Sequence, residues 1–264
     1  MTSPSEIVLL IHGLGGTGQD FGLMRSKLEE SGFQCIDILL PGHGGQPADL
    51  LSTSADQWVE AVRKKIEALR QEYGTVHVIG MCMGALLAAQ AAKMTDLGKN
   101  GRDRLILLAP PLFLDGWSVP WYRALRYVLY QFPLITRLLR YRERAPYGVK
   151  NPRLRAVLQR KFGRGDRFHY GWVPFRTIQE LDSLRKQVRE GLEQICCSTL
   201  LVHAVDDELT SLKSAQFIRD RINSEPSKKH ARLMVLSDSY HMICIDNERE
   251  EVFLNVSKFL GTPA

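Results

Sequence analysis

A cysteine stands between two glycines where an apolar segment meets a segment of small residues. Residues 80–84 read Gly-Met-Cys-Met-Gly, after the apolar segment 76–79 and before the alanine-rich segment 84–94. A strand that turns directly into a helix needs glycines beside the turn, because side chains there would collide with the strand or the helix. The helix N-terminus also favours a thiolate at the turn. The pattern therefore predicts that Cys82 is a nucleophile.

A nucleophilic thiol needs a base, and the base needs a carboxylate to orient it. In an open parallel sheet these groups project from the carboxyl ends of strands or from the loops that follow. His241 lies just after the predicted strand 231–236, and Asp206 and Asp207 directly follow the predicted strand 198–205. The sequence therefore predicts a site made by Cys82, His241 and one of these two aspartates.

The remaining elements form an alternating series. Apolar segments 6–11, 33–40, 76–79 and 104–109 read as buried strands, and segments 20–30, 54–73 and 84–94 read as helices between them. The strands at 198–205 and 231–236 alternate with helices at 211–222 and 247–260. This order predicts an α/β fold with a mostly parallel, doubly wound sheet.

The alternating series of strands and helices is interrupted by an insert that differs from it in periodicity and in charge. Residues 112–195 show helical periodicity throughout, so we expect a helical cap inserted after the fourth strand into a core formed by 1–111 and 196–264. The insert carries 17 Lys/Arg and 7 Asp/Glu, net +10, whereas the rest of the chain carries 18 and 22. These arginines either keep a lid soluble or attract an anionic partner. The candidate anionic partners are an acyl carrier protein, a CoA thioester and an acidic lipid surface. Segment 121–141 is the part of the insert that we expect at the interface with such a surface.

Composition narrows the class of protein. The chain has 264 residues, 44% of them hydrophobic, and the apolar segment 7–11 is too short for a signal sequence or a membrane span. We therefore expect a cytoplasmic protein. Its five cysteines lack paired spacing, so we expect free thiols, all but Cys82 in or near the core, with Cys244 able to line the pocket. No metal-ligand spacing and no nucleic-acid-binding module is recognised.

A glycine-rich stretch offers a competing interpretation. Residues 13–18 satisfy G-x-G-x-x-G after a strand, and Asp37 lies about 20 residues further on, as in nicotinamide- or flavin-binding proteins. A dinucleotide site would leave Cys82, Asp207 and His241 without a role. We therefore predict that the protein uses no cofactor.

The chain resembles the α/β-hydrolase superfamily, and most of all bacterial carboxylesterases and monoacylglycerol lipases. The resemblance rests on His12-Gly13, on the Gly-His-Gly turn at 42–44, on the turn at 80–84 and on the loops carrying Asp207 and His241. It selects Asp207 over Asp206, since the acid ends a Gly-x-x-Asp pattern in which Ala204 replaces the glycine. Cysteine replaces the usual serine, as in the related dienelactone hydrolases and polyhydroxyalkanoate synthases.

The resemblance implies an ester or thioester hydrolase for hydrophobic acyl chains. Cys82 would attack, His241 would transfer the proton, Asp207 would orient the imidazole, and the amides of Leu14 and Met83 would form the oxyanion hole. Passage of the acyl group to an amine, alcohol or thiol is the alternative, and a non-catalytic binding protein is a third. His12 and His43 are expected to shape their loops. No catalytic role is expected for the other four histidines, which are His77, His169, His203 and His230.

Overall fold

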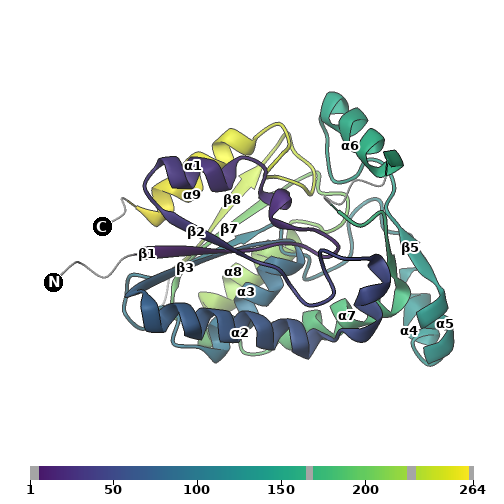
Figure 1. Ribbon diagram of the computed structural model, residues 1–264, viewed down its shortest axis with the longest axis horizontal. Helices are drawn as coiled ribbons and strands as arrows, with labels where there is room; N and C mark the ends of the chain where they lie inside the picture. The colour runs from purple at the N-terminus through teal and green to yellow at the C-terminus, as the bar shows by residue number, and fades with distance from the viewer. Residues whose placement is uncertain (1–5, 165–168, 225–229, 262–264) are drawn as a thin grey trace.

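A computed structural model describes residues 6–164, 169–224 and 230–261 (Figure 1). Its centre is a six-stranded parallel sheet in the order β2-β1-β3-β4-β7-β8. The strands are β1 (Glu6–Ile11), β2 (Gln34–Ile38), β3 (Thr75–Met81), β4 (Arg104–Leu108), β7 (Ser198–Ala204) and β8 (Ala231–Leu236). The predicted α/β class with a doubly wound sheet is confirmed.

Helices cover both faces of this sheet (Figure 1). One face carries α2 (Ala55–Glu72), α3 (Met83–Met94) and α8 (Lys213–Ile222), and the other carries α1 (Met24–Glu30) and α9 (Arg249–Leu260). In β1, Leu9 and Ile11 face the first layer, whereas Val8 and Leu10 face the second. Successive strand residues point to opposite faces, so a strand covered on both sides is apolar at every position.

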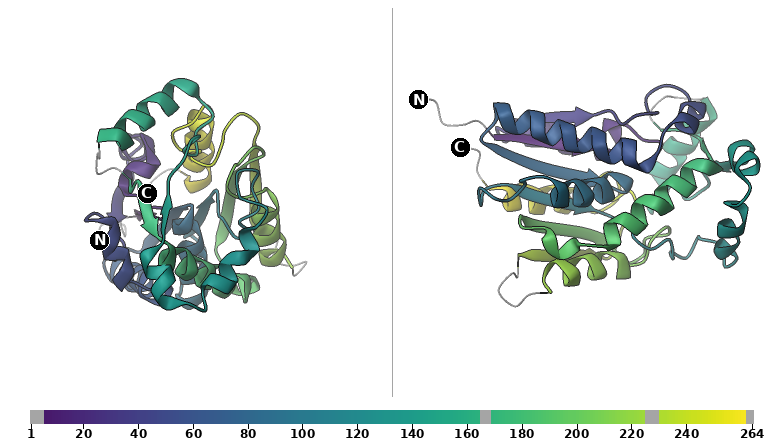
Figure 2. Two further views of the ribbon diagram at one scale, coloured as in Figure 1. Left: turned by 90° about the vertical axis from the view of Figure 1, so that its right-hand side faces the viewer. Right: turned by 90° about the horizontal axis from the view of Figure 1, so that it is seen from below.

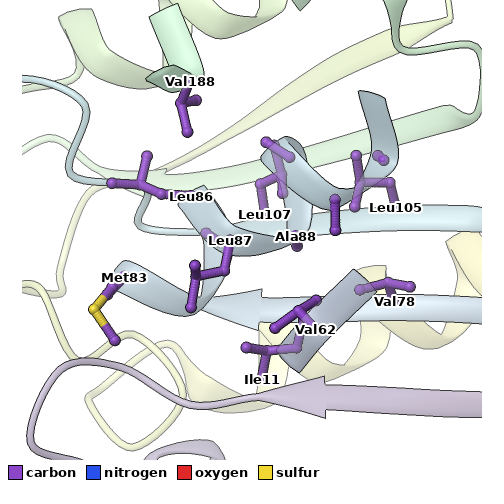
Figure 3. Packing of buried hydrophobic residues seen from close by; sticks show 14 of the residues in the cluster. Ile11, Val62, Val78, Met83, Leu86, Leu87, Ala88, Leu105, Leu107 and Val188 are labelled. Atoms are coloured by element: carbon purple, nitrogen blue, oxygen red, sulfur yellow. The ribbon is translucent and has the colours of Figure 1, made fainter. Parts of the chain in front are cut away.

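The helix α3 lies at the centre of the larger hydrophobic cluster (Figure 3). Its Leu86, Leu87 and Ala88 are fully buried among side chains of the sheet and of neighbouring helices. A helix that is buried on this scale is apolar around most of its circumference. Small residues let α3 approach the sheet closely and hold the turn at Cys82 in place.

The insert between β4 and β7 is not helical throughout, so that expectation is wrong. It contains a two-stranded antiparallel sheet in which Tyr141 pairs with Val173. Each strand has only three residues, which is too short for period-two alternation to appear in the sequence. The elements of the insert are η3 (Arg123–Leu125), α4 (Arg126–Leu129), α5 (Pro133–Leu138), β5 (Arg140–Arg142), α6 (Pro152–Arg164), β6 (Trp172–Pro174), α7 (Phe175–Arg189) and η4 (Leu192–Gln194).

The last long helix of the insert is built into the core. In α7, the side chains of Leu181, Leu184 and Val188 are buried in the same cluster as α2 and α3. The other elements, from η3 to β6, lie beyond the carboxyl ends of the strands (Figure 2). We keep the name cap for residues 112–195, of which α7 is the part that joins it to the core.

Two expected helices are interrupted. The helix expected at 20–30 is divided into η1 (Gly18–Phe21) and α1, because Gly22 has φ +55° and a Cβ there would lie 3.0 Å from the carbonyl oxygen of Cys244. The helix expected from Pro120 onward is the short pair η3 and α4. A further 3-10 helix, η2 (Pro47–Ser52), precedes α2. Within the described ranges, no helix is long and apolar enough to cross a membrane.

Candidate active site

Cys82 occupies a sharp turn between β3 and α3. Its φ of 55° and ψ of −122° lie in a region that residues other than glycine rarely adopt. Its amide donates to the carbonyl oxygen of Leu108 at 2.9 Å, which fixes the turn to β4. A Cβ at Gly84 would lie 2.0 Å from the carbonyl oxygen of Ile11, so only glycine fits there. The thiol stands at the carboxyl edge of the sheet, where Cys82 remains partly exposed.

His241 and Asp207 meet beside this edge. The Nδ1 of His241 lies 2.7 Å from Oδ2 of Asp207, and both side chains are buried. The other carboxylate oxygen of Asp207 accepts hydrogen bonds from the amides of Leu209 (2.9 Å) and Thr210 (3.0 Å). Asp206 points to the surface instead, where it pairs with Lys150 at 2.9 Å. The structure therefore places Asp207, and not Asp206, where it orients the imidazole.

Electrostatics favour a protonated imidazole in this setting. Burial by itself lowers the pKa of His241, but its interactions with Asp207 and Cys82 raise that pKa well above its usual value. Burial raises the pKa of Asp207, but the neighbouring His241 outweighs it and lowers that pKa. No hydrogen bond of normal geometry reaches the Nε2 of His241 from the described residues, and the thiol of Cys82 is a neighbouring group that raises the pKa of the imidazole.

A second buried carboxylate, Glu208, was not anticipated from the sequence. Its Oε2 accepts a hydrogen bond from the amide of His241 at 3.1 Å, so it holds the backbone of the histidine loop. Burial raises the pKa of Glu208, partly offset by His241. The one sequence signal was its place in the acidic run after β7, directly beside Asp207.

The loop after β1 is held in shape by two neutral histidines. The Nε2 of His12 accepts from the amide of Leu40 (3.2 Å), and the Nε2 of His43 accepts from the amide of Gly15 (3.0 Å). Each Nδ1 therefore carries the hydrogen and donates to a carbonyl oxygen, that of Gly13 or of Pro41. Burial lowers the pKa of both imidazoles to about 4. The structure places both histidines in loop-shaping roles.

Asp20 is a further unanticipated support of this loop. Its Oδ2 accepts from the amide of Gly13 at 2.8 Å, and a Cβ at Gly16 would lie 2.0 Å from the same oxygen. Gly13 packs against the nucleophile, since a Cβ there would lie 3.2 Å from Cβ of Cys82. The glycines of segment 13–18 thus meet core side chains. Asp37, the candidate ribose ligand of the dinucleotide interpretation, forms an ion pair with Arg25.

The two predicted oxyanion donors belong to segments that meet at Cys82, since Met83 directly follows it and Leu14 follows Gly13, which packs against it. Met83 begins α3, and an amide in the first turn of a helix has no intrahelical acceptor. Leu14 lies in the loop held by His12, His43 and Asp20. Within the described ranges, neither amide donates to a protein acceptor. Two such donors beside a nucleophile are what a developing oxyanion requires.

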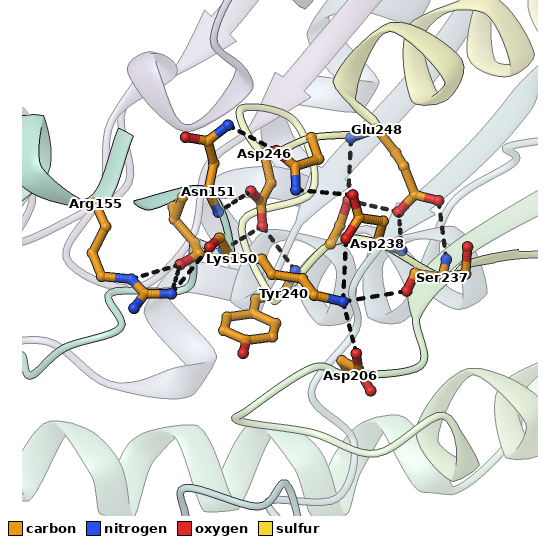
Figure 4. Close-up of polar contacts among 12 residues, drawn as sticks. Lys150, Asn151, Arg155, Asp206, Ser237, Asp238, Tyr240, Asp246 and Glu248 are labelled. Atoms are coloured by element: carbon orange, nitrogen blue, oxygen red, sulfur yellow. Dashed lines mark hydrogen bonds and ion pairs between the residues drawn. The ribbon is translucent and has the colours of Figure 1, made fainter. Parts of the chain in front are cut away.

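The cap is tied to the histidine loop (Figure 4). The Oδ2 of Asp246 accepts from the amides of Lys150 (2.7 Å) and Tyr240 (2.9 Å), and its Oδ1 accepts from the amide of Asn151 (3.0 Å). Asp246 is fully buried. The segment that leads into α6 and the loop that carries His241 therefore form one hydrogen-bonded unit.

The other cysteines lie away from these groups, but two further histidines lie close to them. The Nε2 of His203 lies 3.7 Å from Oδ2 of Asp207, and both side chains are fully buried. Cys196 is exposed, contrary to the expectation that it lies near the core. Cys244 is buried and lines a crevice with Met24 and Phe253, on the side of α1 and α9. The second histidine is His169, whose Cε1 lies 3.3 Å from the position of a Cβ at Gly15. The part of the chain that the structure describes holds no group of three or more His, Cys, Asp or Glu suited to a metal ion.

The fold and the strand-edge site together define an α/β-hydrolase. A family model described as "Serine aminopeptidase, S33" matches residues 2–249, and the chain belongs to this family. It is 23% identical over 256 residues to a carboxylesterase of Bacillus subtilis (strain 168), covering 97% of this chain and 92% of that protein. It is 22% identical over 262 residues to a thermostable monoacylglycerol lipase of Bacillus sp. (strain H-257), covering 97% and 91%.

Solved structures share the architecture. The structure reported for the metagenome-derived lipolytic enzymes LipS and LipT superposes with a TM-score of 0.78 at 18% identity, covering 98% of this chain and 95% of that one. The monoacylglycerol lipase of Paleococcus ferrophilus superposes with a TM-score of 0.73 at 20% identity, with the same coverage. At these identities the likeness shows the fold.

Proposed function

We propose that this protein hydrolyses esters or thioesters of hydrophobic acyl chains through a Cys82–His241–Asp207 triad. The observation that carries the proposal is a partly exposed thiol on a strained turn beside an imidazole whose Nδ1 is bonded to a buried carboxylate. That is the arrangement of an activated nucleophile. Its relatives, named as a carboxylesterase and a monoacylglycerol lipase, support carboxylic esters as the substrate class.

The chemistry proceeds in two steps. The thiolate of Cys82 attacks the carbonyl carbon, and the amides of Leu14 and Met83 hold the oxyanion. The bond to the leaving alcohol or thiol breaks as Nε2 of His241 donates its proton, which leaves a thioester on Cys82. His241 then takes a proton from water, and the resulting hydroxide attacks the thioester and releases the carboxylic acid. The thiolate of Cys82 is restored as its sulfur leaves the acyl carbon, and His241 keeps the proton that it took from water, so the starting charge state is regained.

The sulfur of Cys82 is the observation that favours a second function, acyl transfer. A thioester intermediate passes its acyl group to an amine, an alcohol or a thiol as readily as to water, with His241 removing the proton of the acceptor. The donor would be an acyl ester, a CoA thioester or an acyl carrier protein. Mass spectrometry of reactions with added acceptors distinguishes the two functions, and formation of free acid alone counts against transfer.

Substitution of the proposed nucleophile, Cys82, tests the triad. Cys82→Ala should lower turnover of a nitrophenyl ester by about a thousandfold or more, whereas the exposed thiol control Cys196→Ala should leave it unchanged. The intact mass of the wild-type protein should rise by one acyl group during turnover. Unchanged turnover in Cys82→Ala would rule the triad out. An electrophile that labels Cys82 no faster than Cys35 would favour a non-catalytic binding protein.

A further inference from the structure

The outer side of the cap, residues 121–144, exposes large apolar side chains to solvent. Trp121 is 90% exposed, Leu138 is 79% exposed and Leu134 is 77% exposed. Leu125, Val128 and Phe132 are each more than half exposed as well. Scattered apolar residues are normal on a protein surface, but a concentration of this size marks an interaction site. We call residues 121–144 the cap face.

The outward orientation of these side chains is set by packing. In α5, Thr136 is fully buried, and Leu134 and Leu138 lie two residues to either side of it, about 200° away around the helix. The end of α5 is joined to the start of α7 by a hydrogen bond from the amide of Phe175 to the carbonyl oxygen of Leu139 (2.9 Å). The cap face is therefore a firm surface, and it occupies the front of the left view in Figure 2.

The cap face is also strongly basic. It contains six arginines and a single acidic residue, Glu143. Arg137, Arg142 and Arg144 are exposed and lie on or next to α5 and β5. Arginine beside exposed aromatic and aliphatic side chains is the composition of helices that lie in the interface of an anionic membrane.

A cavity of about 250 Å³ opens between the cap face, the segment 113–115 and α7. It is lined by Arg123, Arg126 and Arg185 together with Phe113 and Tyr127. Arg126 and Arg185 share one carboxylate, Asp182, to which Nε of Arg126 donates at 2.6 Å. Arg123 forms no ion pair with a described residue.

The only carboxylate that lines this cavity is itself engaged. Asp115 accepts hydrogen bonds from the amide and the hydroxyl of Ser211. Three guanidinium groups therefore face two carboxylates, Asp115 and Asp182. The excess positive charge suits a phosphate group, which arginine binds with paired N–H donors.

We propose that the cap face docks on a bilayer containing anionic phospholipid. The apolar side chains enter the acyl boundary, the exposed arginines meet headgroup phosphates, and the cavity behind them receives one of these phosphates. A bilayer with anionic headgroups meets protruding apolar groups and spread positive charge together, which is the combination that the cap face presents. The proposal rests on the proposed function for one point, that acyl substrate reaches Cys82 from the bilayer.

The test uses full-length Cys82→Ala protein, so binding is measured without chemistry. Co-sedimentation with phosphatidylcholine vesicles is compared with vesicles that also contain phosphatidylglycerol. We expect binding to be about tenfold tighter or more with phosphatidylglycerol, to weaken with salt, and to shift Trp121 emission to shorter wavelength. Leu134→Ser with Leu138→Ser should weaken binding to the anionic vesicles about tenfold. Arg137→Gln with Arg142→Gln should reduce the preference for phosphatidylglycerol.

Two matched controls lie far from the cap face. Leu254→Ser on α9 removes a side chain that is 62% exposed, and Arg232→Gln on β8 removes an exposed charge. Both should bind as the parent does, with unchanged circular dichroism. Equal binding to both vesicle types, no binding, or equal weakening by the controls would overturn the proposal, as would binding to an acidic carrier protein in place of vesicles. Ester turnover by Cys82→Ala would overturn the proposed function alone.

Discussion

The amide of Tyr170, in the cap, donates a 2.7 Å hydrogen bond to the carbonyl oxygen of Gly15, in the loop that carries Leu14. The ring of Tyr170 stacks on His43 with centroids 6.0 Å apart, and its hydroxyl donates to the carbonyl oxygen of Gly42 at 3.0 Å. The cap thereby supports the loop that carries Leu14, one of the two proposed oxyanion donors. If the proposed oxyanion hole is correct, Tyr170 links the position of the cap to its geometry.

This link predicts a graded effect of substitutions at Tyr170. Tyr170→Phe keeps the stacking and loses one hydrogen bond, so kcat should fall only a fewfold. Tyr170→Ala removes the support of His43, and kcat should fall by about tenfold to a hundredfold through displaced oxyanion donors. Steady-state kinetics on a nitrophenyl ester, with Tyr73→Phe as a distant control, measure both. Equal losses of kcat in Tyr170→Phe and Tyr170→Ala would contradict this link.

The neighbouring aspartates should behave very differently. Asp207→Asn retains the shape of the side chain but loses the charge that orients and stabilises the imidazolium, so kcat should fall by about a thousandfold or more. Asp206→Asn breaks only an exposed ion pair with Lys150 and should leave kcat within about twofold, because such pairs contribute little. A comparison of kcat for the two variants checks this. A large loss in Asp206→Asn would refute the assignment of Asp207.

The turn at Cys82 predicts a stability effect. Gly84→Ala would place a methyl group 2.0 Å from a backbone oxygen, and relief requires α3 to move away from β1. We expect the free energy of unfolding to fall by about 3 kcal/mol or more, as for a severe overpacking substitution. In Gly171→Ala the nearest atom is 3.8 Å away and φ is not positive, so little change is expected. Urea unfolding of both variants provides the measurement.

Acid should destabilise the protein through its two loop histidines. The pKa of His43 is lowered from 6.5 to about 4 by burial, and His12 behaves alike. Between these values the unfolded chain binds protons that the folded protein does not. The free energy of unfolding therefore falls as the pH drops from about 6.5 to about 4, by up to about 3 kcal/mol for each histidine. Buried Asp20, whose pKa is raised, offsets part of this loss.

Substitution of His43 isolates its share of that dependence. His43→Gln keeps an acceptor for the amide of Gly15 but cannot take up a proton. Its free energy of unfolding, measured in urea at a series of pH values, should fall less steeply below about pH 6.5 than that of the wild-type protein. Identical slopes would show that His43 does not titrate between the folded and unfolded states.

Much of the fold was accessible from local sequence, because its signals are local. Apolar runs of strand length predicted the six strands of the sheet, and the capping box at Ser54 predicted the start of α2. The glycines around Cys82 predicted the turn, because the clash that excludes side chains arises within a few residues. The pair β5 and β6 escaped detection because each is three residues long and is stabilised by a partner about 30 residues away.

The candidate active site also has features that local sequence predicts and features that depend on contacts between distant segments. The sequence by itself determined which residue types follow which strands, and hence that a thiol, an imidazole and a carboxylate converge at one edge of the sheet. The family resemblance had selected Asp207 over Asp206. The tertiary structure shows why the two differ, because these adjacent loop residues point in opposite directions, Asp207 toward His241 and Asp206 toward solvent. Glu208 and Asp20 likewise gain their roles from hydrogen bonds to the amides of His241 and Gly13. Such contacts join segments that are distant in the sequence, so they produce no periodic pattern of residue types from which they could be predicted.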